Sequence, residues 1–138
     1  MTMRTILVID DDRDFLNAIS LVLEQHGFAV RTAATPEEGL AEIRRRTPDL
    51  VVLDVMMPEG HEGFVVARSI REELHLHSLP IVILSSIHVA KQVPYRFAPD
   101  EHYLPVDRFL DKPVLPELLI ATINEVMGDH REEPKHPL

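Results

Sequence analysis

Short apolar runs alternate with longer amphipathic segments along the chain, and this alternation limits the possible folds more than any other feature of the sequence. The runs are about as long as strands that are buried on both faces of a sheet. The segments between them carry apolar residues three and four positions apart, which predicts helices with one buried face. The expected strands are residues 5–9, 28–32, 49–53, 80–84 and 107–111, and the expected helices are residues 12–26, 36–46, 63–74 and 115–127.

This order of elements predicts an α/β domain with a doubly wound, flavodoxin-like parallel sheet of five strands in the order 2-1-3-4-5. Between the last two strands the chain contains Pro94, Pro99 and Pro105. Proline removes a helical hydrogen bond and clashes with the preceding turn, so the fourth helix is expected to be irregular or shortened. We expect one domain over residues 1–127 and a polar tail over residues 128–138.

Local signals mark the ends of two helices. Thr35-Pro36-Glu37-Glu38 forms a capping box with proline at the first helical position. Gly27 stands where a helix-ending glycine belongs. The basic run 44–46 suits the carboxyl end of the second helix and is expected to be a solvated helix end.

Composition excludes several classes of protein. The formal net charge is -9 and no basic stripe is present, which argues against nucleic acid as a direct partner. The absence of cysteine excludes disulfides and thiolate metal sites, and the eight scattered histidines give a poor zinc signal. The first apolar run is too short for a membrane span or a signal peptide. We therefore expect a cytoplasmic protein without a membrane partner.

Polar residues follow four of the five expected strands at the point where each strand ends. Asp10 and Asp11 follow the first strand, Asp54 the third, Ser85 the fourth and Lys112 the fifth. In the expected strand order these four strands are neighbours. Ligands of open α/β sheets bind outside the carboxyl ends of the strands, so these side chains are expected to meet there.

The types of these residues indicate phosphoryl chemistry. Carboxylates brought close together repel one another and need a cation, and an all-oxygen ligand set suits Mg²⁺. A carboxylate such as Asp54 can also act as a nucleophile and form an acyl phosphate. Lys112 would then offset the charge of the phosphoryl group and Ser85 would donate a hydroxyl. Each residue also has an ordinary interpretation. Asp11 or Asp12 could simply cap the first helix, Ser85 could belong to an ordinary turn, and Lys112 to an ordinary strand exit. Their joint placement favours a site.

Four ordered motifs resemble those of response regulator receiver domains, the phosphorylation modules of two-component signalling. The motifs are Ile6–Asp12, Leu50–Pro58, Pro80–Ser86 and Phe109–Pro113, and the resemblance covers residues 4–127. It implies a stand-alone receiver that accepts a phosphoryl group from a histidine kinase or phosphotransfer protein. Such a domain is not an enzyme, beyond self-phosphorylation from a phosphodonor and slow self-dephosphorylation.

The resemblance assigns a role to each site residue. Asp54 is the phosphate acceptor, and Mg²⁺ is held by Asp10, Asp11, Asp54 and the backbone carbonyl of Met56. Lys112 pairs with the phosphoryl oxygens, and its bond to Pro113 is cis.

The resemblance also implies how the signal leaves the domain. Ser85 moves toward the phosphate, and Phe109 occupies the position of the aromatic switch. Phosphorylation then shifts the population toward an active form, which contacts an unknown downstream protein as a monomer or as a phosphorylation-dependent dimer.

Two stretches depart from the family pattern. The loop of residues 59–63, beside the acceptor, is one residue longer than usual. Segment 88–107 is also too long, and its residues 93–98 form either a docking surface or a pinned loop.

Three other functions compete with a phosphorylated receiver. An Asp-nucleophile phosphatase needs a second Asp two positions after Asp54, where this chain has Met56. A degenerate receiver would bind proteins without phosphorylation, although the acidic, Ser and Lys set argues against it. A flavin or nucleotide carrier lacks support because the first strand runs into acids rather than a glycine loop.

Overall fold

The computed structural model describes residues 3–54, 62–86 and 108–131, without the side chains of residues 62–65, 85, 86, 109, 111 and 129–131. Five parallel strands form one sheet in the order β2-β1-β3-β4-β5, as predicted. The strands are β1 (Thr5–Ile9), β2 (Ala29–Ala33), β3 (Leu50–Asp54), β4 (Ile81–Ser86) and β5 (Arg108–Lys112). The predicted irregular fourth helix lies outside the described residues.

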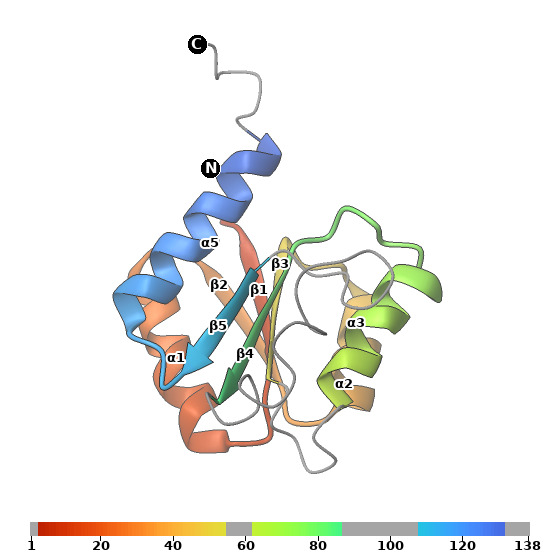
Figure 1. The fold of residues 1–138 in the computed structure, drawn as a ribbon, viewed down its shortest axis with the longest axis horizontal. Helices are drawn as coiled ribbons and strands as arrows, with labels where there is room; N and C mark the ends of the chain where they lie inside the picture. The colour runs from red at the N-terminus through yellow and green to blue at the C-terminus, as the bar shows by residue number, and fades with distance from the viewer. Residues whose placement is uncertain (1–2, 55–61, 87–107, 132–138) are drawn as a thin grey trace.

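Helices cover both faces of the sheet (Figure 1). The helices are α1 (Arg13–Gln25), α2 (Pro36–Arg45), α3 (Glu62–Glu72) and α5 (Pro116–Arg131). Helices α1 and α5 lie on one face, and α2 and α3 lie on the other. None of these described helices combines the length and the apolar character that crossing a membrane requires.

Alternating side chains of the strands build two separate cores. Leu7, Leu53 and Ile83 pack with α2 and α3, whereas Val8, Val52 and Leu84 pack with α1 and α5. All six side chains are fully buried. Burial on both faces explains why the strands read as continuous apolar runs in the sequence.

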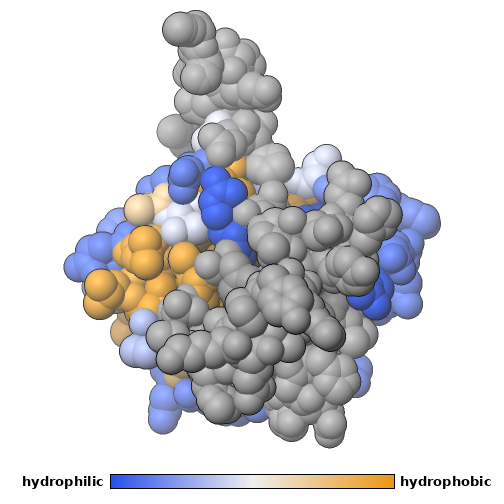
Figure 2. Space-filling view, viewed as in Figure 1, coloured by the Kyte–Doolittle hydropathy of each residue, from blue (hydrophilic) through white to orange (hydrophobic). Residues whose placement is uncertain are grey.

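The surface over α1 and α5 is partly apolar (Figure 2). The exposed large hydrophobic residues of the described chain are Met3, Leu21, Leu115 and Leu118. Two of them lie close together in the sequence: Leu115 directly precedes α5, and Leu118 lies in its first turn.

Four strands, β2 to β5, end later than predicted, and for β3, β4 and β5 this changes where the polar residues sit. Asp54 is the last residue of β3 and Lys112 the last residue of β5, while Ser85 lies within β4. These residues therefore belong to the sheet itself. Their backbones are held by the strand ladder, which fixes their positions more firmly than a following loop would.

Two glycines, Gly27 and Gly128, have different effects on the helices beside or within which they lie. Gly27 adopts a φ of +90° after α1, the conformation that ends a helix. Gly128 instead lies inside α5, which continues to Arg131. The helix therefore enters the predicted polar tail by one turn, since glycine weakens a helix but ends it only when φ turns positive.

Arg31 of the edge strand β2 forms hydrogen bonds that connect this strand to α2. The Arg31 guanidinium donates to Glu42 Oε1 from Nη2 at 2.8 Å and to the Glu42 carbonyl at 2.6 Å. Hydrogen bonds from Arg31 and then from Arg45 lower the pKa of the Glu42 carboxyl. The basic run at the end of α2 is exposed, as expected of a solvated helix end.

The two predicted capping residues, Thr35 and Glu38, both form hydrogen bonds at the start of α2, but Glu38 binds one residue before the N-cap. Thr35 Oγ1 accepts from the backbone N–H of Glu38 at 3.1 Å, and Glu38 Oε1 accepts from the N–H of Ala34 at 3.0 Å. Pro36 occupies the first helical position, where the missing N–H costs nothing. The Glu38 N–H would otherwise lack a partner in the first turn, whereas Ala34 precedes the helix.

Thr35→Ala is expected to lower the free energy of unfolding by about 1 kcal/mol, because the Glu38 N–H loses its acceptor. Thr35→Ser keeps the hydroxyl and should retain most of that stability. Urea unfolding followed by circular dichroism measures both variants. Equal stability of Thr35→Ala and the parent protein would contradict the capping role.

Candidate functional site

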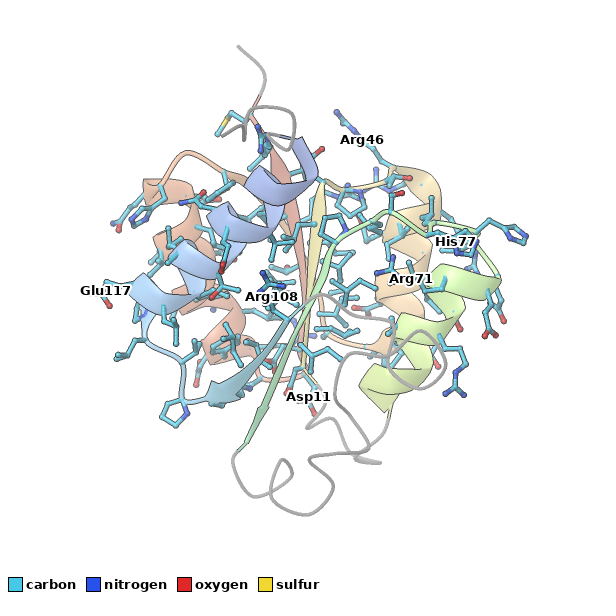
Figure 3. The ribbon with its side chains drawn as sticks, turned by 45° about the horizontal axis from the view of Figure 1, so that its top comes forward. Asp11, Arg46, Arg71, His77, Arg108 and Glu117 are labelled. Carbon is cyan, nitrogen blue, oxygen red and sulfur yellow. The ribbon has the colours of Figure 1, made fainter. Side chains whose placement is uncertain are left out.

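Three carboxylates from two neighbouring strands meet at the carboxyl edge of the sheet. Asp10 follows β1 and is 1% exposed, and Asp54 ends β3 and is 2% exposed. Asp11 is exposed, at the edge where the strands end (Figure 3). One ligand oxygen from each lies within 4.8 Å of the others. The predicted meeting of these three side chains is confirmed.

Asp10 is held in place through both of its carboxylate oxygens. Oδ1 accepts from the backbone N–H of Asp12 at 2.9 Å, and Oδ2 accepts from Lys112 Nζ at 3.0 Å. The backbone N–H of Asp10 donates to the Ala33 carbonyl of β2 at 3.0 Å. These contacts set the direction of the Asp10 side chain.

The aspartates that follow β1 have two different roles, one at the candidate site and one at the start of α1. Asp12 is the N-cap of α1, and its Oδ1 accepts from the backbone N–H of Phe15 at 3.1 Å. The ordinary capping interpretation is thus correct for Asp12. It does not apply to Asp10, whose side chain points to Lys112.

Lys112 reaches the site from the end of the edge strand β5. Its Nζ lies 3.0 Å from Asp10 Oδ2 and 3.6 Å from Asp54 Oδ1, and its side chain is 19% exposed. The Lys112–Pro113 bond is cis, as expected. One ammonium group thus lies against the two buried carboxylates.

The residues at this edge fit a hard divalent cation. In the described part of the chain, the three carboxylates lie near the Lys112 ammonium group, whose single charge offsets only part of their formal negative charge. All the available ligand atoms are oxygens, the donors that Mg²⁺ prefers. Asp10, Asp11 and Asp54 are therefore the residues that could hold the ion. The fourth predicted ligand, the Met56 carbonyl, lies outside the described residues.

The two predicted switch residues are described only in their backbone. In the β3–β4 ladder Asp54 lies opposite Leu84, so Ser85 comes one position beyond that pair. In the β4–β5 ladder Ser85 lies opposite Asp111, and Phe109 lies opposite Ile83. Ser85 thus lies near the carboxyl edge of the sheet, whereas Phe109 is the second residue of β5, three positions before Lys112. Their roles as switch side chains stay predictions.

One aromatic residue at the site was missed as a site residue by the sequence analysis. The ring centroid of Phe15 lies 4.5 Å from Lys112 Nζ. Phe15 stands in the first turn of α1, three residues after Asp12, and an apolar residue of an amphipathic helix is expected simply to face the core. Its nearness to the end of β1 is the signal that could have suggested a second role.

Comparison with known proteins identifies the family. The family model described as the response regulator receiver domain matches residues 6–124. The chain belongs to this family. The protein PilH of Pseudomonas aeruginosa is 30% identical to it over 129 residues, in a match that covers 91% of this chain and 99% of PilH.

Two further relatives show how receivers occur in proteins of different length. The transcriptional regulatory protein AfsQ1 of Streptomyces coelicolor is 44% identical over 84 residues, which are 61% of this chain and 36% of AfsQ1. The chain therefore spans about a third of that relative. The crystal structure of the chemotaxis response regulator CheY4 of Vibrio cholerae is 27% identical, with a TM-score of 0.77 over 91% of this chain and 99% of CheY4.

Proposed function

We propose that this receiver is a phosphorylation switch in which Asp54 accepts a phosphoryl group from a histidine kinase or phosphotransfer protein. One observation carries the proposal. The Asp54 carboxylate ends a central strand with an ammonium group 3.6 Å away and two further carboxylates around it. Nucleophile, cation and candidate metal ligands thus share one edge of the sheet.

In the proposed reaction an oxygen of the Asp54 carboxylate forms a bond to the phosphorus of the donor. The bond between phosphorus and the donor atom breaks, and its electron pair leaves with the imidazole of a phosphohistidine or with the acetate of acetyl phosphate. The product is an acyl phosphate on Asp54. Lys112 stays within reach of the new phosphoryl oxygens, because it already lies beside Asp54 Oδ1.

Asp10, Asp11 and Asp54 would hold Mg²⁺ in this reaction. When bound, Mg²⁺ supplies positive charge that offsets the repulsion between the carboxylates and the phosphoryl oxygens. The chain's own part is to fix the ligand oxygens. The backbone N–H of Asp12 and the ammonium group of Lys112 do this for Asp10.

The output of the switch is proposed to be a protein–protein contact. Ser85 and Phe109 would change side-chain position when Asp54 is phosphorylated, and a downstream protein would bind the altered surface. The domain would turn over no free substrate beyond its own slow phosphorylation and dephosphorylation. A receiver that binds its partner without phosphorylation is the alternative.

Acetyl phosphate with Mg²⁺ is expected to add one phosphoryl group to the protein, as measured by intact mass. Chelation of the metal should prevent the reaction. Hydroxylamine should remove the group, because it cleaves an acyl phosphate and leaves a phosphoserine intact. No adduct, or an adduct that resists hydroxylamine, would overturn the proposal and favour the phosphorylation-independent alternative.

A further inference from the structure

The ammonium group of Lys112 lies close to residues from three different parts of the fold. Asp10 Oδ2 lies at 3.0 Å and Asp54 Oδ1 at 3.6 Å, while the centroid of the Phe15 ring lies at 4.5 Å. An aromatic ring attracts a cation over its face within about 6 Å of the centroid. The ring therefore acts on the same charged group that pairs with the proposed phosphate acceptor.

The position of Phe15 is fixed by the acidic run that builds the site. Its backbone N–H donates to the capping oxygen of Asp12 at 3.1 Å, and Asp12 N–H in turn donates to Asp10 Oδ1 at 2.9 Å. The ring is half-buried and packs against the core cluster that contains Leu16 and Ile19. The ring and the Asp10 carboxylate are thus held relative to each other by two hydrogen bonds within one short segment.

We propose that Phe15 is a positioning residue that holds the Lys112 ammonium group beside Asp54. A lysine side chain is long, flexible and strongly hydrated, so it tends to swing out into water. The ring face attracts the ammonium group and keeps water from one side of it, which opposes that movement. An aliphatic side chain would fill the space without this attraction. The inference rests on the proposed function, because the position of Lys112 can affect phosphoryl transfer only if Asp54 is the phosphate acceptor.

Phe15→Leu is expected to lower the rate of labelling by acetyl phosphate at saturating Mg²⁺ by roughly threefold to tenfold. Phe15→Tyr keeps a ring face and should stay near the parent rate. The matched control is Phe28→Leu, the same substitution in the same core cluster. Phe28 lies at the other end of α1, where its N–H donates to the Leu23 carbonyl at 3.1 Å. Phe28→Leu should lose stability but keep the labelling rate.

A double-mutant cycle separates positioning from packing. With Lys112→Met as the background, no ammonium group remains to be positioned, so Phe15→Leu should cause no further fall in rate. An undiminished rate in Phe15→Leu alone would overturn the inference. An equal fall in the labelling rate of Phe28→Leu would also overturn it. So would an equal loss of rate from Phe15→Leu in the parent and in the Lys112→Met backgrounds.

The ring contact also has a spectroscopic signature that does not depend on phosphorylation. The chain has three lysines, Lys91, Lys112 and Lys135, so their ε-methylene signals can be assigned by substitution. The ring current of Phe15 should shift the Lys112 signal upfield in the parent protein, and Phe15→Leu should abolish that shift. If acetyl phosphate failed to phosphorylate the parent protein, the proposed function would be refuted. An unshifted Lys112 signal would instead refute the inference about Phe15.

Discussion

Replacing Asp54 with asparagine is expected to abolish labelling by acetyl phosphate. The amide keeps the volume of the side chain but lacks the carboxylate oxygen that would attack phosphorus. Asp54 is 2% exposed at the end of β3, so a side chain of the same shape should preserve the local packing. Intact-mass measurement after incubation with acetyl phosphate and Mg²⁺ detects the loss.

Asp49→Asn is the matched control for this loss. Asp49 lies just before β3, at the opposite end of the same strand, where its Oδ2 accepts from the Thr5 N–H at 2.7 Å. It should therefore be labelled like the parent protein. A label that persists on Asp54→Asn, or disappears equally from Asp49→Asn, would contradict the assignment of the acceptor.

Asp11→Asn distinguishes a metal ligand from the acceptor. Asp11 is exposed and contributes one of the three clustered oxygens. Its replacement should raise the Mg²⁺ concentration needed for half-maximal labelling by roughly tenfold or more. Replacing a residue that only hydrogen-bonds to a metal ligand already weakens metal binding by about that factor. Saturating Mg²⁺ should then restore the label, which no concentration should do for Asp54→Asn.

The strand order and the two cores could be predicted from the sequence because they depend on patterns that are local and strong. Strands such as β1 and β3 are buried on both faces, so nearly every residue in them is apolar. The strand ends were predicted less well, by one or two residues, because polar residues such as Asp54 and Lys112 interrupt the apolar pattern before the ladder stops. Hydrophobicity marks the edge of the core, whereas hydrogen bonding marks the end of the strand.

The grouping of Asp10, Asp11, Asp54 and Lys112 could also be predicted, since parallel strands bring their carboxyl ends to one edge. The contact between Phe15 and Lys112 could not. It joins residues 97 positions apart, and a phenylalanine on the apolar stripe of a helix gives no sign that part of its ring leaves the core. Only the three-dimensional arrangement shows which atoms lie over the ring face.

Lys112→Met is expected to lower the free energy of unfolding by about 3 kcal/mol in the absence of Mg²⁺. The substitution keeps a long, unbranched side chain but removes the ammonium group that lies 3.0 Å from Asp10 and 3.6 Å from Asp54. Both carboxylates are buried, and a buried charge that loses its partner is strongly destabilising. Urea unfolding with a chelator present measures this loss.

Two further measurements test whether charge, rather than packing, causes this loss. Mg²⁺ should stabilise Lys112→Met, because a ligand that binds only the folded state adds about 2.7 kcal/mol at a concentration one hundred times its dissociation constant. Adding Asp54→Asn to Lys112→Met should recover part of the stability without any metal, since one of the two buried charges is then gone. Asp54→Asn in the parent background leaves Lys112 paired with Asp10, so it should cost little. If Lys112→Met unfolded like the parent protein, or if neither Mg²⁺ nor Asp54→Asn rescued it, the ammonium group would not be what balances the charge of this site.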